Sequence, residues 1–265
     1  MSFNWLNFEL SLNLTTSGQN ASNKMLKITL LILLLSTFTV WAETEQITIA
    51  AEDSWPPYAN ADGTGLANEI ITAAFATQNI EVEFHVYPYA RVLHYLDTAA
   101  YVAGFNVPID AVTKQKYLLG DTPLYEAFSA YYQNTEQPLE IVNREQFNGQ
   151  SVGVVRGYGY GQHHLDLIAK NAITIADANT DSANVKRLMM GRLDSALIFI
   201  KVANLLQRQQ VLPKEVQLAF INEGTDIYLA FSRNHPDAMR LQKKFELGLQ
   251  EIISTGERDS ILAKY

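Results

Sequence analysis

The sequence predicts an α/β fold built from mainly parallel strands. Between residues 46 and 264, short apolar segments with period-two alternation take turns with longer segments whose apolar residues recur every three to four positions. Such alternation is typical of strand–helix–strand units, which place parallel strands side by side. Hydrophobic residues make up 48% of the chain, which is enough for a proper core. The Gln- and Asn-rich link 133–148 is the best candidate for a boundary between two lobes.

In the first half, residues 46–51 alternate as a strand, and Pro56 and Pro57 prevent this strand from continuing. Residues 66–78 and 89–96 each carry an apolar face with helical spacing. Further strands are expected over 81–87, 102–107 and 128–132, with a short helix or turn over 113–119.

The second half repeats the pattern. Strands are expected over 151–155, 173–176, 194–200, 217–221 and 227–232. Helices are expected over 162–170, 181–190, 202–209, 236–253 and 260–264.

The N-terminal segment predicts export. A basic stretch from Lys24 to Lys27 precedes an apolar block, and small residues follow at Val40 and Ala42, as in a cleaved signal peptide. The block is shorter than the roughly 20 apolar residues of a membrane-spanning helix. We therefore expect residues 1–42 to be an N-terminal extension and signal peptide, with the true start at Met25 and cleavage after Ala42. The mature protein would be periplasmic; a buried N-terminal core helix is the alternative interpretation.

Composition excludes several classes of function. The chain has a net charge of −8, so it lacks the basic surface that nucleic acid binding requires. It has no cysteine, which excludes disulfides, thiolate metal sites, a catalytic cysteine and attachment of a lipid to cysteine. Neither a metal site nor a cofactor is expected.

Two loops carry candidate ligand-binding residues. Glu52, Trp55 and Tyr58 follow the first strand at its carboxyl end, where open α/β sheets bind ligands. The run Arg156-Gly157-Tyr158-Gly159-Tyr160-Gly161 follows another strand and opens a helix, so its backbone N–H groups can hold a carboxylate. The alternatives are an aromatic cap on the core for the first loop and a plain tight turn for the second.

Other polar residues could complete such a site. Arg91 could clamp a carboxylate, Asn106 lies at the end of a strand, and Lys114 follows shortly after it. Motifs for a serine nucleophile, a zinc protease or a phosphate-binding loop are absent from the sequence. The adjacent His163 and His164 are expected to be solvated helix residues. These observations favour binding over catalysis.

Over residues 45–265 the chain resembles the bacterial periplasmic solute-binding proteins of family 3, the receptors of polar amino-acid ABC importers. The resemblance rests on the ordered segments 47–58, 63–66, 122–125, 152–157, 188–196 and 256–265. It implies two α/β lobes of the type II periplasmic-binding-protein fold, with two parallel-type sheets joined by two crossing strands at 128–132 and 227–232. Lobe 1 would comprise 43–129 and 226–265, and lobe 2 would comprise 130–225.

The resemblance also assigns roles to residues. Glu52 takes the place of the acidic ligand contact, Trp55 that of the stacking aromatic, and 156–159 that of the loop that meets the ligand carboxylate. Lys114 stands where the family has a carboxylate-binding arginine, and Phe199 where it has the aspartate that holds an α-ammonium group. These two departures argue against a standard α-amino acid, and Arg91 and Arg156 are expected to supply the anion contacts. Asp194 is expected to be structural.

The implied function is capture of a small amino-acid-like or carboxylate metabolite, anionic or zwitterionic, by a free monomer that passes it to an ABC permease. An enzyme is not expected. The alternatives are a cyclohexadienyl-dehydratase-like enzyme, with Glu52 as general acid, and a sensory binding module that acts through a membrane partner.

Overall fold

The computed structural model describes residues 44–265. The predictions about the signal peptide, the start at Met25 and cleavage after Ala42 therefore lie outside the described residues. Within 44–265, the helices are too short or too polar for any of them to cross a membrane.

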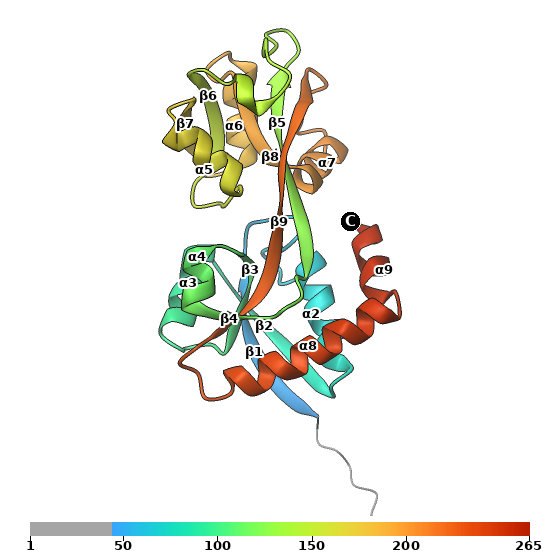
Figure 1. The fold of residues 1–265 in the computed structure, drawn as a ribbon. Helices are drawn as coiled ribbons and strands as arrows, with labels where there is room; N and C mark the ends of the chain where they lie inside the picture. The colour runs from blue at the N-terminus through green and yellow to red at the C-terminus, as the bar shows by residue number, and fades with distance from the viewer. Residues whose placement is uncertain (1–43) are drawn as a thin grey trace, which may run out of the picture. The chain divides into compact units, whose positions relative to one another are not determined.

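The described residues form an alternation of strands and helices (Figure 1). The strands are β1 (Glu45–Glu52), β2 (Ile80–Tyr87), β3 (Ala103–Pro108), β4 (Tyr117–Leu119), β5 (Tyr125–Asn134), β6 (Gln150–Val155), β7 (Ile173–Ala178), β8 (Ser195–Phe199) and β9 (Val216–Ser232). The helices are α2 (Leu66–Ala76), α3 (Tyr89–Asp97), α4 (Ala111–Lys116), α5 (Gln162–Ala169), α6 (Asp181–Met189), α7 (Ile200–Arg208), α8 (Ala238–Ser254) and α9 (Glu257–Lys264), with a 3-10 turn at Arg144–Gln146.

Hydrogen bonding runs through one mixed sheet in the order β2-β1-β3-β9-β5-β8-β6-β7, with β4 paired to β9. Parallel strands β1, β2 and β3 lie at one end, and parallel strands β6, β7 and β8 at the other. The long strands β5 and β9 pair antiparallel and run through both groups (Figure 1). We call the β1–β4 end, with α2–α4, α8 and α9, lobe 1, and the β6–β8 end, with α5–α7, lobe 2.

This arrangement is the two-lobed α/β architecture expected from the sequence, with one difference in the sheets. The two parallel sets are joined into a single sheet, because β5 pairs over its whole length with β9, from Tyr125 opposite Ile227 to Asn134 opposite Val216. The rest of β9 pairs with β3 and β4. The boundaries 43–129 with 226–265 and 130–225 stay a prediction.

Two elements differ from the sequence-based expectation. β9 is one strand of 17 residues, where the sequence predicted separate strands at 217–221 and 227–232. The polar residues between them stay in the strand because β5 pairs across them, and because Asn222 donates to Ser129 Oγ (3.0 Å) and to the backbone oxygen of Tyr160 (2.8 Å). β4, which pairs with the end of β9, was expected as the end of a short helix or turn; three residues are too few for a periodic pattern.

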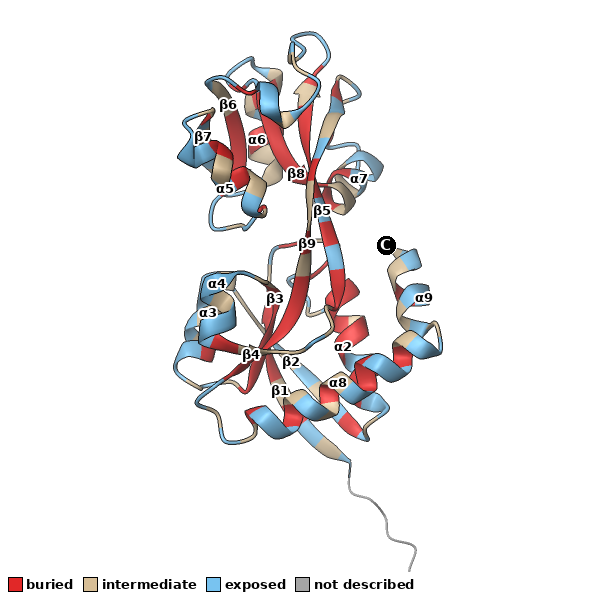
Figure 2. Ribbon diagram, viewed as in Figure 1, coloured by how far each residue is buried: buried red, intermediate tan, exposed pale blue. Residues whose placement is uncertain are grey.

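Each lobe has its own packing centre (Figure 2). In lobe 1, α8 lies against α2, with the Phe75 and Phe245 rings 5.1 Å apart. A β-carbon at Gly248 of α8 would overlap the backbone oxygen of Ala74, so the two helices approach more closely than a larger side chain would allow. In lobe 2, Tyr131 packs on Phe147 at a centroid distance of 4.9 Å. These two contacts lie on opposite sides of the β5–β9 pair, within one continuous cluster of buried apolar residues.

Asp194 lies within lobe 2 and ties two segments together. Its Oδ2 accepts hydrogen bonds from the backbone N–H and the hydroxyl of Ser151, both at 2.7 Å. The Asp194 N–H in turn donates to Ser151 Oγ at 3.0 Å. These bonds join the start of β6 to the turn before β8, which fits the structural role expected for this residue.

Candidate functional site

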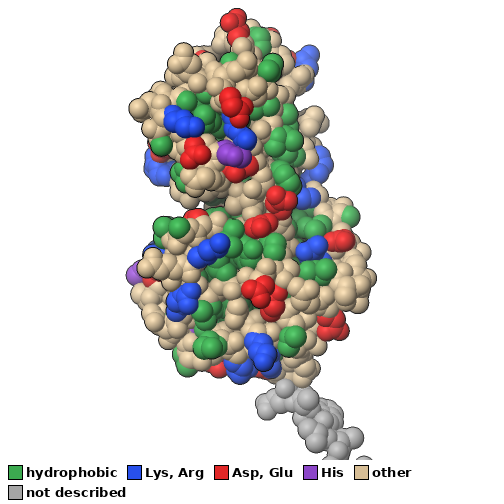
Figure 3. All heavy atoms as spheres, in the orientation of Figure 1, with side chains coloured by type: hydrophobic (Ala, Val, Ile, Leu, Met, Phe, Trp, Pro, Cys, Tyr) green, Lys and Arg blue, Asp and Glu red, His purple; other side chains and the backbone are tan. Residues whose placement is uncertain are grey.

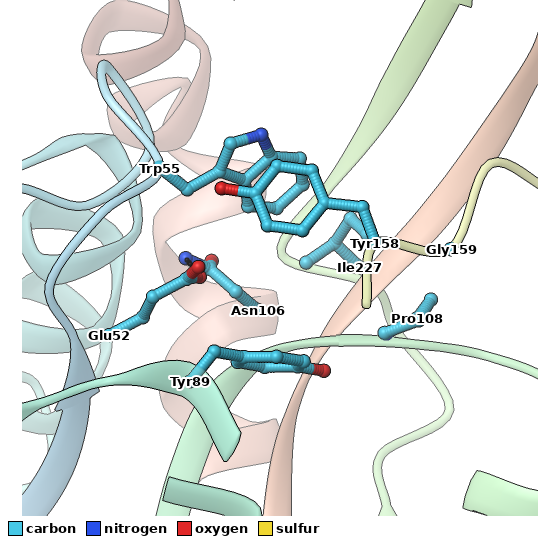
Figure 4. Close-up of a pocket in the computed structure, with 8 residues that line it drawn as sticks. All are labelled: Glu52, Trp55, Tyr89, Asn106, Pro108, Tyr158, Gly159 and Ile227. Atoms are coloured by element: carbon cyan, nitrogen blue, oxygen red, sulfur yellow. Dashed lines mark hydrogen bonds between the residues drawn. The ribbon is translucent and has the colours of Figure 1, made fainter. Parts of the chain in front are cut away.

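A pocket lies between the lobes, at the carboxyl ends of β1 and β3. Its enclosed space is about 20 Å³, room for about one water molecule, so a ligand enters only as the lobes move apart. Its lining residues are Glu52, Trp55, Tyr89, Asn106, Pro108, Tyr158, Gly159 and Ile227 (Figure 4). Tyr158 and Gly159 belong to lobe 2, Ile227 to β9 and the others to lobe 1, so both lobes contribute walls.

Glu52, the last residue of β1, supplies the pocket's carboxyl group and is 1% exposed. Its Oε2 accepts a hydrogen bond from Asn106 Nδ2 at 3.0 Å, and Asn106 Oδ1 accepts one from the Tyr125 hydroxyl at 2.6 Å. Asn106 has φ of +63°, within an irregularity of β3 between Gly104 and Val107. Such bulges redirect side chains next to functional sites, and here Asn106 is placed against Glu52.

The environment of Glu52 favours its protonated form. Burial raises the pKa of Glu52 to about 7, and the charge of Asp53 acts in the same direction. The hydrogen bond from Asn106 acts against this shift without cancelling it. Near neutral pH the carboxyl can therefore lose or take a proton when a ligand enters.

Aromatic rings form the upper wall of the pocket as drawn in Figure 4. Trp55 lies 4.8 Å from Phe199 and 5.7 Å from Tyr158, measured between ring centroids. Tyr58 is buried behind Trp55 at 4.3 Å and stacks on Tyr125 at 4.9 Å. Phe199 and Tyr58 therefore support the Trp55 ring, while Trp55 and Tyr158 face the pocket.

The glycine-rich loop after β6 brings lobe 2 to lobe 1. The Tyr158 hydroxyl donates to the backbone oxygen of Ser54 at 2.9 Å. Gly157 has φ of +83°, a conformation that other residues rarely adopt, and it turns the chain so that Tyr158 reaches across. This hydrogen bond joins the two lobes directly beside the pocket.

We expect Tyr158→Phe to weaken closure of the lobes. The variant keeps the ring but loses a hydrogen bond worth about 1 kcal/mol, or roughly fivefold in the balance between closed and open molecules. Small-angle X-ray scattering of the ligand-free variant should give a larger radius of gyration than the parent. Tyr101→Phe, a matched change on lobe 1 outside the pocket, should leave the radius unchanged. Equal radii in the parent and Tyr158→Phe would contradict this role.

The structure does not bring the three expected basic residues to the pocket. Arg91 on α3 and Lys114 on α4 are exposed. Arg156 is also exposed, and its Nε donates to Asp177 Oδ2 at 2.5 Å. Gly157 lies at the surface next to the pocket rather than in its wall. Of the predicted residues, the pocket thus gathers Glu52, Trp55, Asn106, Tyr158 and Gly159.

Three lining residues were not predicted from the sequence: Tyr89, Pro108 and Ile227. Tyr89 begins α3 directly after Pro88, and this helix start beside a strand end is the signal that could have identified it. Pro108 ends β3, two residues after Asn106. Ile227 belongs to β9, and only the pairing of β9 with β3 brings it to the site.

The expectation for the histidine pair is wrong for one of its members. His164 is 5% exposed, and its ring packs on Tyr160 at a centroid distance of 5.5 Å. This burial lowers the pKa of His164 to about 4, so the ring is neutral. His163 is half-exposed, with its Nδ1 3.3 Å from Glu223 Oε2. In residues 44–265, His, Asp and Glu side chains do not gather in threes around any point that could hold a metal ion.

Charged side chains on the face seen in Figure 3 are scattered, with both signs interspersed over the two lobes. This face therefore carries no broad field of one sign that would direct a charged partner to it.

No protein-family model and no curated protein sequence matches the chain. Solved structures do. An ancestral arginine-binding protein bound to arginine shares 21% identity over 83% of this chain and 97% of its own, with a TM-score of 0.69. A histidine kinase sensor domain with similarity to periplasmic binding proteins shares 16% identity over 84% of this chain and 97% of its own, with a TM-score of 0.70. An ancestral amino-acid-binding protein, a precursor of cyclohexadienyl dehydratase, shares 16% identity over 83% of this chain and 94% of its own, with a TM-score of 0.67. These likenesses show that residues 44–265 have the periplasmic-binding-protein fold.

Proposed function

We propose that this chain is a solute-binding protein that captures a small amino-acid-like metabolite between its lobes. The observation that carries the proposal is the pocket itself, whose walls come from both lobes and whose edge is bridged by the bond from Tyr158 to Ser54. A ligand that touches both lobes favours the closed arrangement, because its contacts are complete only there. The similar structures include an ancestral arginine-binding protein and an ancestral amino-acid-binding protein, which supports this class of ligand.

The cellular setting is also part of the proposal. We propose that the chain is exported to the periplasm through the signal sequence before residue 43, is cleaved after Ala42 and acts as a free monomer. Its partner would be an ABC permease that recognises the closed form, with lobe boundaries at 43–129 with 226–265 and at 130–225. One similar structure is a histidine kinase sensor domain, so the alternative partner is a membrane-bound receptor.

Binding is tested by thermal unfolding against a metabolite collection that contains amino acids, organic acids, amines and sugars. A ligand at about 100 times its dissociation constant should stabilise the protein by about 2.7 kcal/mol, which for a chain of this size is roughly 5–10 °C in melting temperature. Absence of any shift across the collection would refute the solute-binding function.

A second candidate function is aromatisation of a cyclohexadienyl acid: the bond to the ring hydroxyl breaks with loss of water, and the bond to the ring carboxylate breaks with loss of CO2, whose electron pair completes the aromatic ring. The buried Glu52, with its raised pKa, can hold a proton near neutral pH and deliver it to a leaving hydroxyl. One of the similar structures is a precursor of such a dehydratase, although the majority of them are binding proteins. Incubation with prephenate or arogenate and detection of the aromatic product separates the two functions: turnover would favour the enzyme, and binding without turnover the receptor.

A further inference from the structure

The charged groups around the pocket have one sign. Among the residues that the structure describes, those lining the pocket include Glu52 but no lysine, arginine or histidine. Asp53 is close enough that its charge raises the pKa of Glu52, and Asp181, the first residue of α6, acts on Tyr158 from lobe 2 in the same way. A cation that enters therefore meets acidic groups at these positions, and its charge favours the ionised form of Glu52.

One carboxyl oxygen of Glu52 is available to a ligand. Oε2 is held by Asn106, whereas Oε1 is buried and has no hydrogen-bond partner in residues 44–265. An unpaired buried acceptor costs about 1–3 kcal/mol, so a ligand that brings a donor to Oε1 removes this cost. A positively charged donor gives a stronger hydrogen bond than a neutral donor, since its charge also offsets that of the carboxylate.

Aromatic rings surround the same space. Trp55 and Tyr158 lie on one side of the Glu52 carboxyl group and Tyr89 on the other (Figure 4). The face of an aromatic ring attracts a cation by about 0.5–2 kcal/mol, depending on how far the pair is removed from water. A carboxylate among several rings is the composition of sites that recognise amines and methylated ammonium groups.

A ligand carboxylate has no positive partner here. Arg91 and Lys114 are exposed outside the pocket, and Arg156 is engaged by Asp177. A carboxylate placed between the lobes would lie beside Glu52, so one of the two acids would have to stay protonated. The departures at Lys114 and Phe199 noted in the sequence thus remove the features that select an α-amino acid and leave those that select a positive charge.

We propose that the pocket binds a small organic cation, an amine or methylated ammonium compound without a carboxylate, through Glu52 and the three rings around it. This inference rests on the proposed solute-binding function and reverses the sign of the ligand charge expected from the sequence. The amino-acid-like metabolite is thereby narrowed to one that lacks the acid group.

Tryptophan fluorescence reads this pocket directly. The chain contains Trp5, Trp41 and Trp55, so the full chain with Trp5→Phe and Trp41→Phe reports on Trp55 alone. Two matched sets of probes isolate the charge. Choline is compared with its uncharged isostere 3,3-dimethyl-1-butanol and with glycine betaine, which carries a carboxylate. Agmatine is compared with arginine, which differs from it by a carboxylate.

We expect choline or agmatine to bind about tenfold or more tightly than its uncharged or carboxylated counterpart. Glu52→Gln, which keeps the shape and removes the charge, should weaken that binding by about tenfold or more. Glu136→Gln, the same change at an exposed position in lobe 2, should leave it unaltered. Full affinity in Glu52→Gln, or tighter binding of the uncharged or carboxylated probe, would overturn the proposal.

The thermal screen described above separates failure of this inference from failure of the solute-binding function. A shift produced only by acids, zwitterions or neutral compounds keeps the binding function and refutes the cation. If an amine other than choline or agmatine raises the melting temperature, the effect of Glu52→Gln decides. Loss of the shift in this variant supports a cationic ligand, and persistence of the shift refutes it. No shift with any compound refutes both.

Discussion

At pH 8, Glu52→Gln should stabilise the ligand-free protein by about 3 kcal/mol relative to the parent. Burial raises the pKa of Glu52 from its usual 4.5 to about 7, so the folded protein holds a proton that the unfolded chain releases above pH 4.5. The stabilising contribution of this carboxyl is complete below pH 4.5 and is lost as pH rises through 7. Glutamine cannot ionise, so the variant escapes the loss.

Chemical unfolding of both proteins at pH 4.5 and pH 8, without ligand, measures this effect. The difference between parent and variant should be small at the lower pH and reach its full size at the higher pH. Glu136→Gln is the matched control, because it makes the same change at an exposed position. A difference that is the same at both pH values would show that the variant acts by packing and that Glu52 ionises normally.

Gly248→Ala should destabilise the protein by about 3 kcal/mol, which lowers the melting temperature by roughly 6–12 °C. A β-carbon at this position would overlap the backbone oxygen of Ala74, and it would press on the Thr77 hydroxyl oxygen at 2.9 Å. Helices α2 and α8 would have to separate, which disturbs the Phe75–Phe245 contact. The gain in helix propensity from glycine to alanine, about 1 kcal/mol, offsets only part of this loss.

Leu247→Ala is the control for this variant. Leu247 precedes Gly248 in α8 and its side chain is 56% exposed, so its removal should change stability by less than about 0.5 kcal/mol. Differential scanning calorimetry of the three proteins gives the comparison. An unchanged or higher melting temperature for Gly248→Ala would mean that the helices are not in backbone contact.

The alternation of strands and helices could be predicted because each element carries its pattern locally. β2, for example, has side chains that alternate between partly buried and exposed, and α2 buries one continuous face. The break expected within β9 was wrong because its polar segment is held by β5, a partner that lies about a hundred residues earlier in the chain. Local periodicity contains no information about such a partner.

The residues of the candidate site also divide into those that local sequence could predict and those that depend on distant partners. Glu52 and Trp55 could be identified because a loop at the carboxyl end of a strand points to one edge of the sheet wherever the strand lies. Ile227 could not, since its place depends on the pairing of β9 with β3. Arg156 was expected in the pocket because it borders the glycine-rich loop, but Asp177 on the neighbouring strand holds its side chain elsewhere. Long charged side chains follow their nearest opposite charge, which the sequence does not locate.

The passage of β5 and β9 through both lobes has a consequence for the order in which the chain can fold. Lobe 1 joins the first described residues to the last, since β3 pairs with β9 and α2 packs on α8. Most of lobe 2 comes from one uninterrupted segment between the two long strands. Contacts between distant segments form slowly, and a chain made from its N-terminus cannot close lobe 1 before β9 and α8 exist. The part of the domain that is synthesised first is therefore the last to be completed.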